Sequence, residues 1–178
     1  MPELIQPDVR VHRSFLEAMA ELRDDGYGNP RDASTIGRDM RERSGLWETE
    51  EGFARYTELL RSEAEGRNLP PGYVPATSLW WVDGATYFGC IHIRHELTGP
   101  LREVGGHIGY YVRPSARRRG HATAMLRAAL PFVHQLGIHS ALLTCDASNI
   151  ASRKVIEANG GAFEDERHGK LRYWMATG

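Results

Sequence analysis

An Asp-Gly pair between two apolar segments is the sequence feature that most restricts the fold of this chain. Residues 78–82 and 85–93 are rich in aromatic and β-branched side chains, and Asp83 and Gly84 separate them. An Asp-Gly pair in this setting is the strongest short-range signal of a β-hairpin. The sequence therefore predicts two antiparallel strands here, after a helical pattern that ends before Pro75.

Hydrophobic spacing predicts helices before this hairpin and a mixture of helices and strands after it. Apolar residues recur at helical spacing over 8–24 and 49–67, and a polar stretch without a clear pattern lies between these two segments. This order of elements is typical of a mixed α+β or α/β sheet with helices on its faces. The elements predicted after the hairpin are a strand over 106–112, a helix over 117–136, a strand over 139–145, a helix over 149–159 and a hairpin of strands over 162–167 and 171–175.

The length and composition fit one globular domain. The chain has 178 residues, of which 41% are hydrophobic, enough to bury a core without disulfides or a structural metal. Cys90 and Cys145 are too few for a disulfide framework and lack the spacing of metal ligands. Basic and acidic residues number 22 and 23, so the net charge of −1 argues against a general attraction to nucleic acid or anionic membrane. We expect no metal, no nucleic-acid or membrane partner, and a cytoplasmic location.

The segment from Tyr111 to Ala122 carries the clearest chemical signal. A strand ends near Val112, a short turn comes next, and a helix begins among three arginines and Gly120. The first turn of a helix leaves backbone N–H groups without partners at the positive end of the helix dipole. Gly120 has no side chain, so an anion can approach the backbone there. The pattern predicts a site for a doubly charged group such as a pyrophosphate.

The same arginines have a simpler interpretation as a solvated charged face of the helix. Arginine near a helix N-terminus is slightly unfavourable, because both charges are positive. That placement is easier to understand if an anion lies among the side chains. A nucleic-acid site is a further interpretation, but one basic tripeptide without a wider basic surface is weak support for it.

These residues resemble the acetyl-coenzyme A motif of the GNAT acyltransferase superfamily. The run from Arg117 to Ala122, Arg-Arg-Arg-Gly-His-Ala, is similar to the family's (Gln/Arg)-x-x-Gly-x-(Gly/Ala) motif, which comes after the fourth strand and holds the pyrophosphate through backbone amides. Gly89 and the Asn149-x-x-Ser152 pattern occur in the family's order. The resemblance covers residues 79–175, and parts of it are similar to a bacterial subgroup of predicted acetyltransferases.

The resemblance implies a GNAT-like mixed, mostly antiparallel sheet of about six or seven strands, splayed centrally, with helices on both faces. It implies a single domain over 1–178, with 1–75 as the helical acceptor side and 76–178 as the cofactor-binding core. Acetyl-CoA is the implied cosubstrate, and Val112 is expected to offer backbone hydrogen bonds to its pantetheine arm. The implied cofactor-binding residues are Tyr111, Val112, Arg117, Arg118, Arg119, Gly120, His121, Ala122, Thr123, Asn149 and Ser152.

Asn149 has two compatible interpretations. The family residue at this place contacts the pantetheine, and Ser152 lies one helical turn later on the same face. Asn is also a favoured helix-capping residue, so Asn149 can be expected to cap the helix that begins after it.

The general acid departs from the family pattern. Many members have a tyrosine four residues after the serine position, whereas this chain has Ile156. A thiol with a pKa near 8.5 can leave as a thiolate at pH 7 for about 2 kcal/mol, so a dedicated acid is not essential. Ser152, Tyr110 and Tyr173 remain alternative proton donors.

The general base is expected on the strand that flanks the thioester. An alkylammonium acceptor with a pKa near 10.4 must lose a proton before it attacks. His107 is the leading candidate, with Glu103 and Glu96 as alternatives in a loop, and a histidine satisfied by backbone hydrogen bonds is the structural alternative.

The sequence therefore predicts an N-acetyltransferase that moves acetyl from acetyl-CoA to a primary amine by direct attack in a ternary complex. The alternative is a non-catalytic sensor of acetyl-CoA or CoA. The acceptor is a small-molecule or peptide amine, and Glu50, Glu51, Glu58 and Glu103 weakly suggest a cationic one. The sequence does not determine the oligomeric state, and because the family is often dimeric, a homodimer is one alternative.

Overall fold

Seven strands form a single sheet in the computed structural model, which describes residues 1–178. Their order across the sheet is β1-β2-β3-β4-β5-β7-β6, and every neighbouring pair is antiparallel except β4 and β5. The expected mixed, mostly antiparallel sheet is confirmed. The strands are β1 (Glu3–Ile5), β2 (Ala76–Asp83), β3 (Thr86–Arg94), β4 (Ile108–Val112), β5 (Ser140–Asp146), β6 (Ala162–Arg167) and β7 (Lys170–Ala176).

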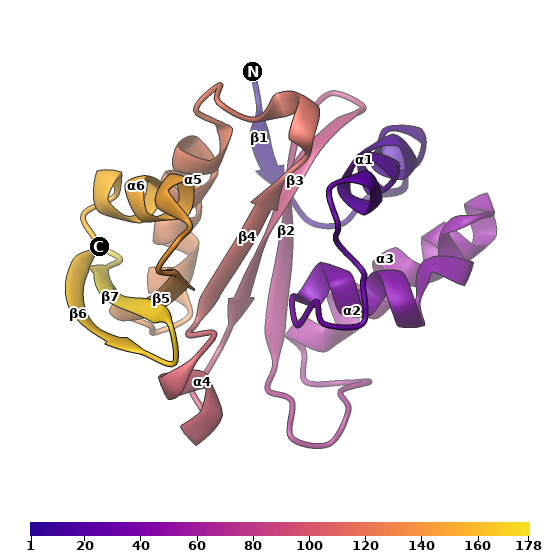
Figure 1. Ribbon diagram of the computed structural model, residues 1–178. Coiled ribbons are helices and arrows are strands. Elements are labelled where there is room, and N and C mark those ends of the chain that lie inside the picture. The colour runs from indigo at the N-terminus through magenta and orange to yellow at the C-terminus, as the bar shows by residue number, and fades with distance from the viewer.

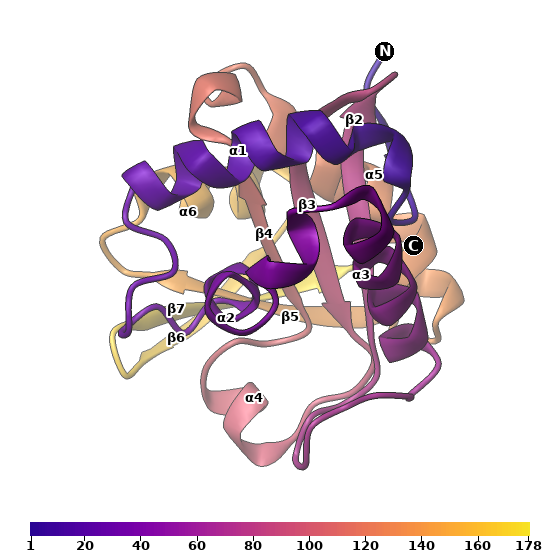
Figure 2. The same cartoon turned by 90° about the vertical axis from the view of Figure 1, so that its right-hand side faces the viewer.

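Helices cover both faces of this sheet, as expected. Figures 1 and 2 show α1, α2 and α3 on one face, α5 and α6 on the other, and the short α4 at one end of the sheet. None of these helices has both the length and the apolar character needed to cross a membrane. The helices are α1 (His12–Asp24), α2 (Thr35–Glu42), α3 (Glu50–Ala64), α4 (Gly99–Glu103), α5 (His121–Gln135) and α6 (Ile150–Ala158).

The two helical layers pack on two separate hydrophobic clusters. Along β2, Trp80 and Val82 belong to the cluster of 15 buried residues under α1, α2 and α3. Leu79 and Trp81 belong to the cluster of 19 buried residues under α5 and α6. Neighbouring side chains of a strand point to opposite faces. An apolar run without alternation therefore marks a strand that is covered on both sides.

Most elements lie where the sequence predicts them, and the differences have local causes. Asp83 ends β2, and Gly84, with a φ of 58°, forms the predicted hairpin turn. The helix predicted from Arg117 begins only at His121, because Arg118 and Gly120 have φ angles of 61° and 81° that a right-handed helix excludes. The elements β1, α2 and α4 were not predicted, since they span only 3, 8 and 5 residues and show little periodicity.

The strands β4 and β5 touch at one end and then separate. Ile108 and Leu143 form their only register pair, which confirms the expected central splay. Beside this pair, the N–H of His107 donates to the carbonyl oxygen of Leu142, and the N–H of Leu142 donates to the Nδ1 atom of the His107 ring. A Cβ at Gly106 would overlap with the carbonyl oxygen of Leu142. Gly106 and His107 therefore form a close junction from which the two strands diverge.

Backbone groups of β4 face the gap that this divergence creates. The carbonyl oxygen of His107 accepts a hydrogen bond from the N–H of Arg94, and the N–H of Arg113 donates to the carbonyl oxygen of Phe88. The odd-numbered residues of β4 therefore direct their backbone groups toward β3. In an antiparallel pair, alternate residues point to opposite sides. Tyr110 and Val112 therefore direct their backbone groups away from β3, toward the side from which β5 has moved away.

Helix α1 holds the turn that comes after β4. Glu21 accepts hydrogen bonds from Arg113 at 2.5 and 3.0 Å and from the N–H and hydroxyl of Ser115 at 2.9 Å each. One turn later, Asp25 forms an ion pair with Arg117 at 2.8 Å. Burial raises the pKa of Glu21, but the bonds from Arg113 and Ser115 outweigh it, so the pKa lies below its usual value. The helix thereby fixes the start of the arginine-rich segment.

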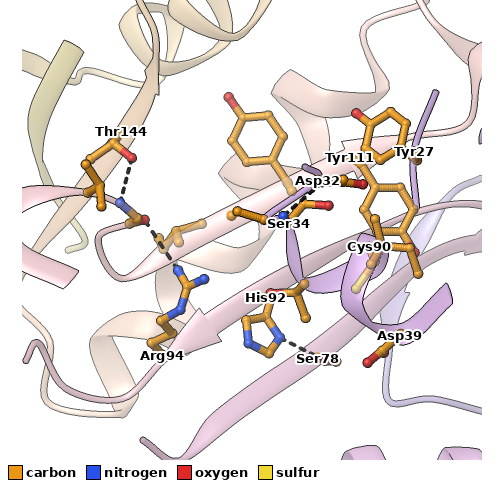
Figure 3. Close-up of a pocket in the computed structure, with 18 of the residues that line it drawn as sticks. Tyr27, Asp32, Ser34, Asp39, Ser78, Cys90, His92, Arg94, Tyr111 and Thr144 are labelled. Carbon is orange, nitrogen blue, oxygen red and sulfur yellow. Dashed lines mark hydrogen bonds between the residues drawn. The ribbon is translucent and has the colours of Figure 1, made fainter. Parts of the chain in front are cut away.

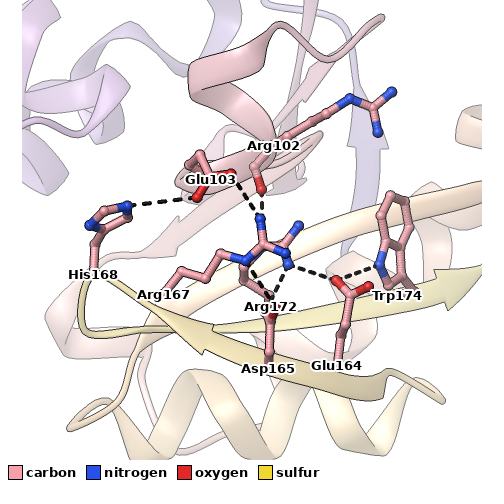
Figure 4. A network of polar contacts seen from close by, with 8 residues as sticks. All are labelled: Arg102, Glu103, Glu164, Asp165, Arg167, His168, Arg172 and Trp174. Atoms are coloured by element: carbon pink, nitrogen blue, oxygen red, sulfur yellow. Dashed lines mark hydrogen bonds and ion pairs between the residues drawn. The ribbon is translucent and has the colours of Figure 1, made fainter.

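Helix α4 is anchored to the hairpin of β6 and β7 (Figure 4). Glu103 pairs with Arg167 at 2.8 Å, and the carbonyl oxygen of Arg102 accepts a hydrogen bond from Arg172 at 2.9 Å. Arg172 is only 4% exposed and pairs with two carboxylates of β6. These contacts hold the segment between α4 and β4 against the C-terminal part of the sheet.

Replacing Gly106 by alanine should lower the free energy of unfolding by more than about 2 kcal/mol, because the new Cβ overlaps with β5 and the φ of 64° is unfavourable for alanine. Gly109→Ala is the matched control on β4, since no atom lies within 4 Å of its Cβ position. That variant should change stability by less than about 1 kcal/mol. Urea unfolding measures both, and equal stabilities would contradict the close junction.

The Glu21→Gln substitution should lower the free energy of unfolding at pH 7 by about 1–3 kcal/mol, because it removes the charge that faces the buried Arg113. The contribution of Glu21 is complete above its ordinary pKa of 4.5 and is lost as the pH falls through its lower folded-state pKa. The difference between wild type and variant should therefore shrink below about pH 4 in urea unfolding. The exposed Glu58→Gln is the control, and an equal effect there would contradict the specific role of Glu21.

Candidate functional site

The segment that leads into α5 presents a row of free backbone donors. The six consecutive N–H groups from Arg118 to Thr123 donate to no protein acceptor. Gly120 caps the helix with a φ of 81°, and no atom lies within 4 Å of its Cβ position. Arg118 and Arg119 are exposed, and neither forms an ion pair. Free amides, the positive end of the helix dipole and two unpaired cations together make an anion-binding surface.

Two other predicted residues of this segment have structural partners. Arg117 donates from Nε to the carbonyl oxygen of Val112 at 3.2 Å, in addition to its ion pair with α1. The ring of His121 stacks on Phe88 with a centroid distance of 4.5 Å and accepts a hydrogen bond from Trp81. These contacts keep the segment in place, while the N–H groups from Arg118 to Thr123 stay free to bind a ligand.

The predicted residues Tyr110 and Ser152 lie together. Their hydroxyl oxygens are 2.8 Å apart, although one residue lies on β4 and the other on α6. Burial raises the pKa of Tyr110 to about 12, more than the hydrogen bond to Ser152 lowers it, so the phenol keeps its proton at neutral pH. Asn149 accepts a hydrogen bond from the N–H of Ser152 at 3.1 Å, which confirms the expected helix cap.

Ile156 and Tyr173 contact other residues than Tyr110 and Ser152. Ile156 is fully buried in the core under α6, where Gly161 packs directly on it. The Tyr173 hydroxyl donates to Glu157 at 3.1 Å. The position at which many relatives have a tyrosine is therefore filled by a core side chain.

A cavity of about 760 Å³ lies on the α2 side of the sheet (Figure 3). Its walls come from the end of α1, the segment before α2, the strands β3 and β4, and the loop after α4. It also reaches Thr144 and Asp146 of β5, beyond the point at which β4 and β5 separate. The N-terminal helices and the loop near Glu103 therefore enclose a space beside β4.

Sequence analysis did not identify the polar residues at the centre of this cavity. The ring of His92 is hydrogen-bonded to Ser78 at 3.1 Å, and burial lowers the pKa of His92 to about 3, so the ring is neutral. Asp39 is 2% exposed and accepts a hydrogen bond from the Tyr56 hydroxyl at 2.8 Å. His92 lies on a predicted strand, but its exposure to the cavity depends on α2, which the sequence did not predict.

The predicted site residues divide into three groups. Tyr110 and Tyr111 line the cavity, the residues from Arg117 to Thr123 lie beyond the other end of β4, and Asn149 and Ser152 lie on α6. His107 does not line the cavity. Its Nδ1 atom is occupied by a backbone N–H, and burial lowers its pKa to about 4. The alternative bases Glu96 and Glu103 also lie outside the cavity.

Three solved structures of acetyltransferases share the fold of this chain. RimJ of Mycobacterium smegmatis in complex with CoA-disulfide is 22% identical, with a TM-score of 0.66 over 98% of this chain and 81% of that one. PaiA N-acetyltransferase of Thermoplasma acidophilum in complex with coenzyme A is 15% identical, with a TM-score of 0.61 over 99% of both chains. An acetyltransferase of Salmonella typhimurium that modifies the N-terminal serine of ribosomal protein L7/L12 is 14% identical, with a TM-score of 0.61 over 98% and 94%.

Comparison with curated proteins gives no match. The model of the GNAT acetyltransferase domain, however, matches residues 32–162, which is most of the chain and includes β4, the free amides before α5 and most of the residues that line the cavity. On that match, this protein belongs to the GNAT family of acetyltransferases.

Proposed function

We propose that this protein is an N-acetyltransferase that moves an acetyl group from acetyl-CoA to a primary amine by direct attack in a ternary complex. In this proposal, residues 76–178 bind the cofactor and residues 1–75 provide the acceptor side of one domain. The observation that carries it is the row of six free N–H groups at the start of α5, next to the gap in the sheet. Holding both substrates in register would provide most of the rate enhancement.

The free amides from Arg118 to Thr123 are suited to the diphosphate of acetyl-CoA. A diphosphate offers several oxygen acceptors and two negative charges, and the segment offers six donors and two unpaired arginines. The glycine at position 120 leaves room for those oxygens against the backbone. Arg117 is the exception among the predicted ligands, because Asp25 already neutralises its charge.

The gap between β4 and β5 is suited to the pantetheine arm. Tyr110 and Val112 direct backbone groups into it, and an extended chain with amides can add to such an edge as a strand would. Val112 offers its N–H there, while its carbonyl oxygen accepts a bond from Arg117. Asn149, the cap of α6, and Ser152, in its first turn, lie across the gap and would contact the pantetheine arm from that side. Such a contact is compatible with the helix cap that Asn149 forms.

Tyr110 and Ser152 are our candidates for the proton donor to the departing thiolate. Their hydroxyl groups share one hydrogen bond, and Tyr110 reaches the cavity where the acetyl group and the amine would meet. His107 has a different role in this proposal. Its neutral ring holds the junction of β4 and β5, so it positions the strand beside the thioester and does not act as the base.

The acceptor enters, in this proposal, through the cavity on the α2 side. Its volume of about 760 Å³ is large enough for several residues of a peptide or for a small metabolite. The similarity in fold to an acetyltransferase that modifies a ribosomal protein's N-terminal serine supports a peptide amine as one candidate acceptor.

Replacing Gly120 by glutamate should weaken acetyl-CoA binding at least about 100-fold, because the carboxylate would block the free amides and repel the diphosphate. Gly137→Glu is the matched control at the other end of α5. Both glycines have left-handed φ angles, 81° and 84°, and open space around the Cβ position, so the backbone strain is the same. Calorimetry should give a wild-type affinity for the control, and equal affinities for both variants would refute the cofactor site.

The Tyr110→Phe and Ser152→Ala substitutions should each lower kcat about tenfold or more, with little change in the KM for acetyl-CoA. Because the two hydroxyl groups share one hydrogen bond, the double variant should be no slower than the slower single variant. Tyr173→Phe tests the remaining donor and should stay within about twofold of wild type. A steady-state thiol-release assay measures kcat and KM for each variant. Loss of activity in the Tyr173 variant alone would reassign the proton donor.

A further inference from the structure

Arg94 lies at the end of β3 between two neighbouring cavities. It lines the cavity of about 760 Å³ beside β4 and a second cavity of about 510 Å³ between α2 and the loop that precedes β2. His92, two residues earlier on the same strand, also lines both. The two cavities therefore adjoin along β3, with Arg94 in the wall of both, and Figure 3 shows its side chain in the first of them.

The guanidinium of Arg94 has no carboxylate partner. Its Nη1 atom donates to the carbonyl oxygens of Gly105 and Gly106 at 3.3 and 3.1 Å, and its Nε and Nη2 atoms donate to no protein acceptor but stay accessible. The other well-buried arginines are paired. Arg113 pairs with α1, and Arg172 pairs with β6. A part-buried cation without a counter-ion is costly, which points to an anion that comes from outside the protein.

A second guanidinium faces the same space. Arg38 of α2 lines the second cavity, its guanidinium lies 4.7 Å from the ring centre of Tyr73, and its buried Nε atom has no hydrogen-bond partner. Its nearest carboxylate is Asp39 at 3.7 Å, which also faces Arg43 at 3.4 Å. The carboxylate of Asp39 is thus shared between the guanidinium groups of Arg38 and Arg43.

Acidic and basic residues both line the two cavities, but no carboxylate pairs with Arg94. Asp25, Asp39 and Asp146 face other cations, namely Arg117, Arg43 and Lys170. The exposed Arg41 and Glu42 add one charge of each sign, and Glu63 is paired with Arg43. Burial lowers the pKa of Arg94, and the nearby Arg38 lowers it further. None of Glu50, Glu51, Glu58 and Glu103, which had suggested a cationic acceptor, lines either cavity.

Arg94 lies close to the part of β4 at which a substrate amine has room. His92 lies opposite Gly109 of β4, and no atom lies within 4 Å of the Gly109 Cβ position. Arg94 lies two residues further along β3, on the same face of the strand as His92. Guanidinium groups bind carboxylates and phosphates through two parallel hydrogen bonds.

We propose that Arg94, together with Arg38, binds an anionic group of the acceptor, so that the preferred acceptor is a primary amine that also carries a carboxylate or phosphate. A peptide with an acidic second residue carries both groups. The inference rests on the proposed function, because it takes the amine to lie over Gly109, beside the thioester.

The test uses three tripeptides that differ only at the second residue, which is glutamate, glutamine or phosphoserine. For the wild-type protein, the KM of the two anionic peptides should be at least about tenfold lower than that of the glutamine peptide. The R94Q variant should lose this preference in KM, and R94K should keep part of it, since lysine retains the charge but not the paired donors. The exposed R67Q variant is the control and should behave as wild type.

Calorimetric titration of the same peptides into the protein–CoA complex gives a second measurement that needs no turnover. Arg94 also holds Gly105 and Gly106 by hydrogen bonds, so the stability and the CoA affinity of R94Q are measured to show that the variant is folded. The R38Q variant removes the second guanidinium, on α2, and is tested with the same peptides. Equal binding of all three peptides to wild type, or an unchanged preference in folded R94Q and R38Q, would overturn the anion site. Preferential binding of the anionic peptides without acetyl transfer would instead support the anion site and count against the proposed function.

Discussion

The separation of β4 and β5 is the constraint on which the rest of this structure depends. A sheet normally satisfies the backbone groups of a central strand on both sides, and here one side is satisfied at a single register pair. Gly106 and His107 make the separation abrupt. Gly106 lets β5 approach closely, and the Nδ1 atom of the His107 ring accepts the hydrogen bond from the N–H of Leu142 that a backbone carbonyl would otherwise accept. The separation creates a strand edge in the middle of the molecule, and helices of both layers enclose it.

The order of elements could be predicted from the sequence because their signals are local. The Asp83-Gly84 turn and the double-sided apolar run of β2 depend only on neighbouring residues. The free amides before α5 were also predictable, since a glycine at a helix start after a strand is a short-range pattern. The resemblance to a known family then gave that pattern a chemical meaning.

The cavity on the α2 side could not be predicted in the same way. His92 and Arg94 are alternate residues of a strand, and nothing in their spacing shows that α2 leaves a cavity above them. His107 shows the opposite case, in which a residue with suitable chemistry is occupied by a contact 35 positions away. Long-range packing decides whether a polar side chain in a strand meets a substrate or a backbone group.

The C-terminal end of α1 contacts both halves of the site. Asp25 lines the cavity beside β4 and pairs with Arg117, while Glu21 holds the preceding turn. A ligand in the cavity that displaced Asp25 would change how the arginine-rich segment is held, and an anion on that segment would act on the cavity wall in return. Thermodynamic linkage would require the two effects to be equal, so each ligand would alter the affinity for the other by the same factor.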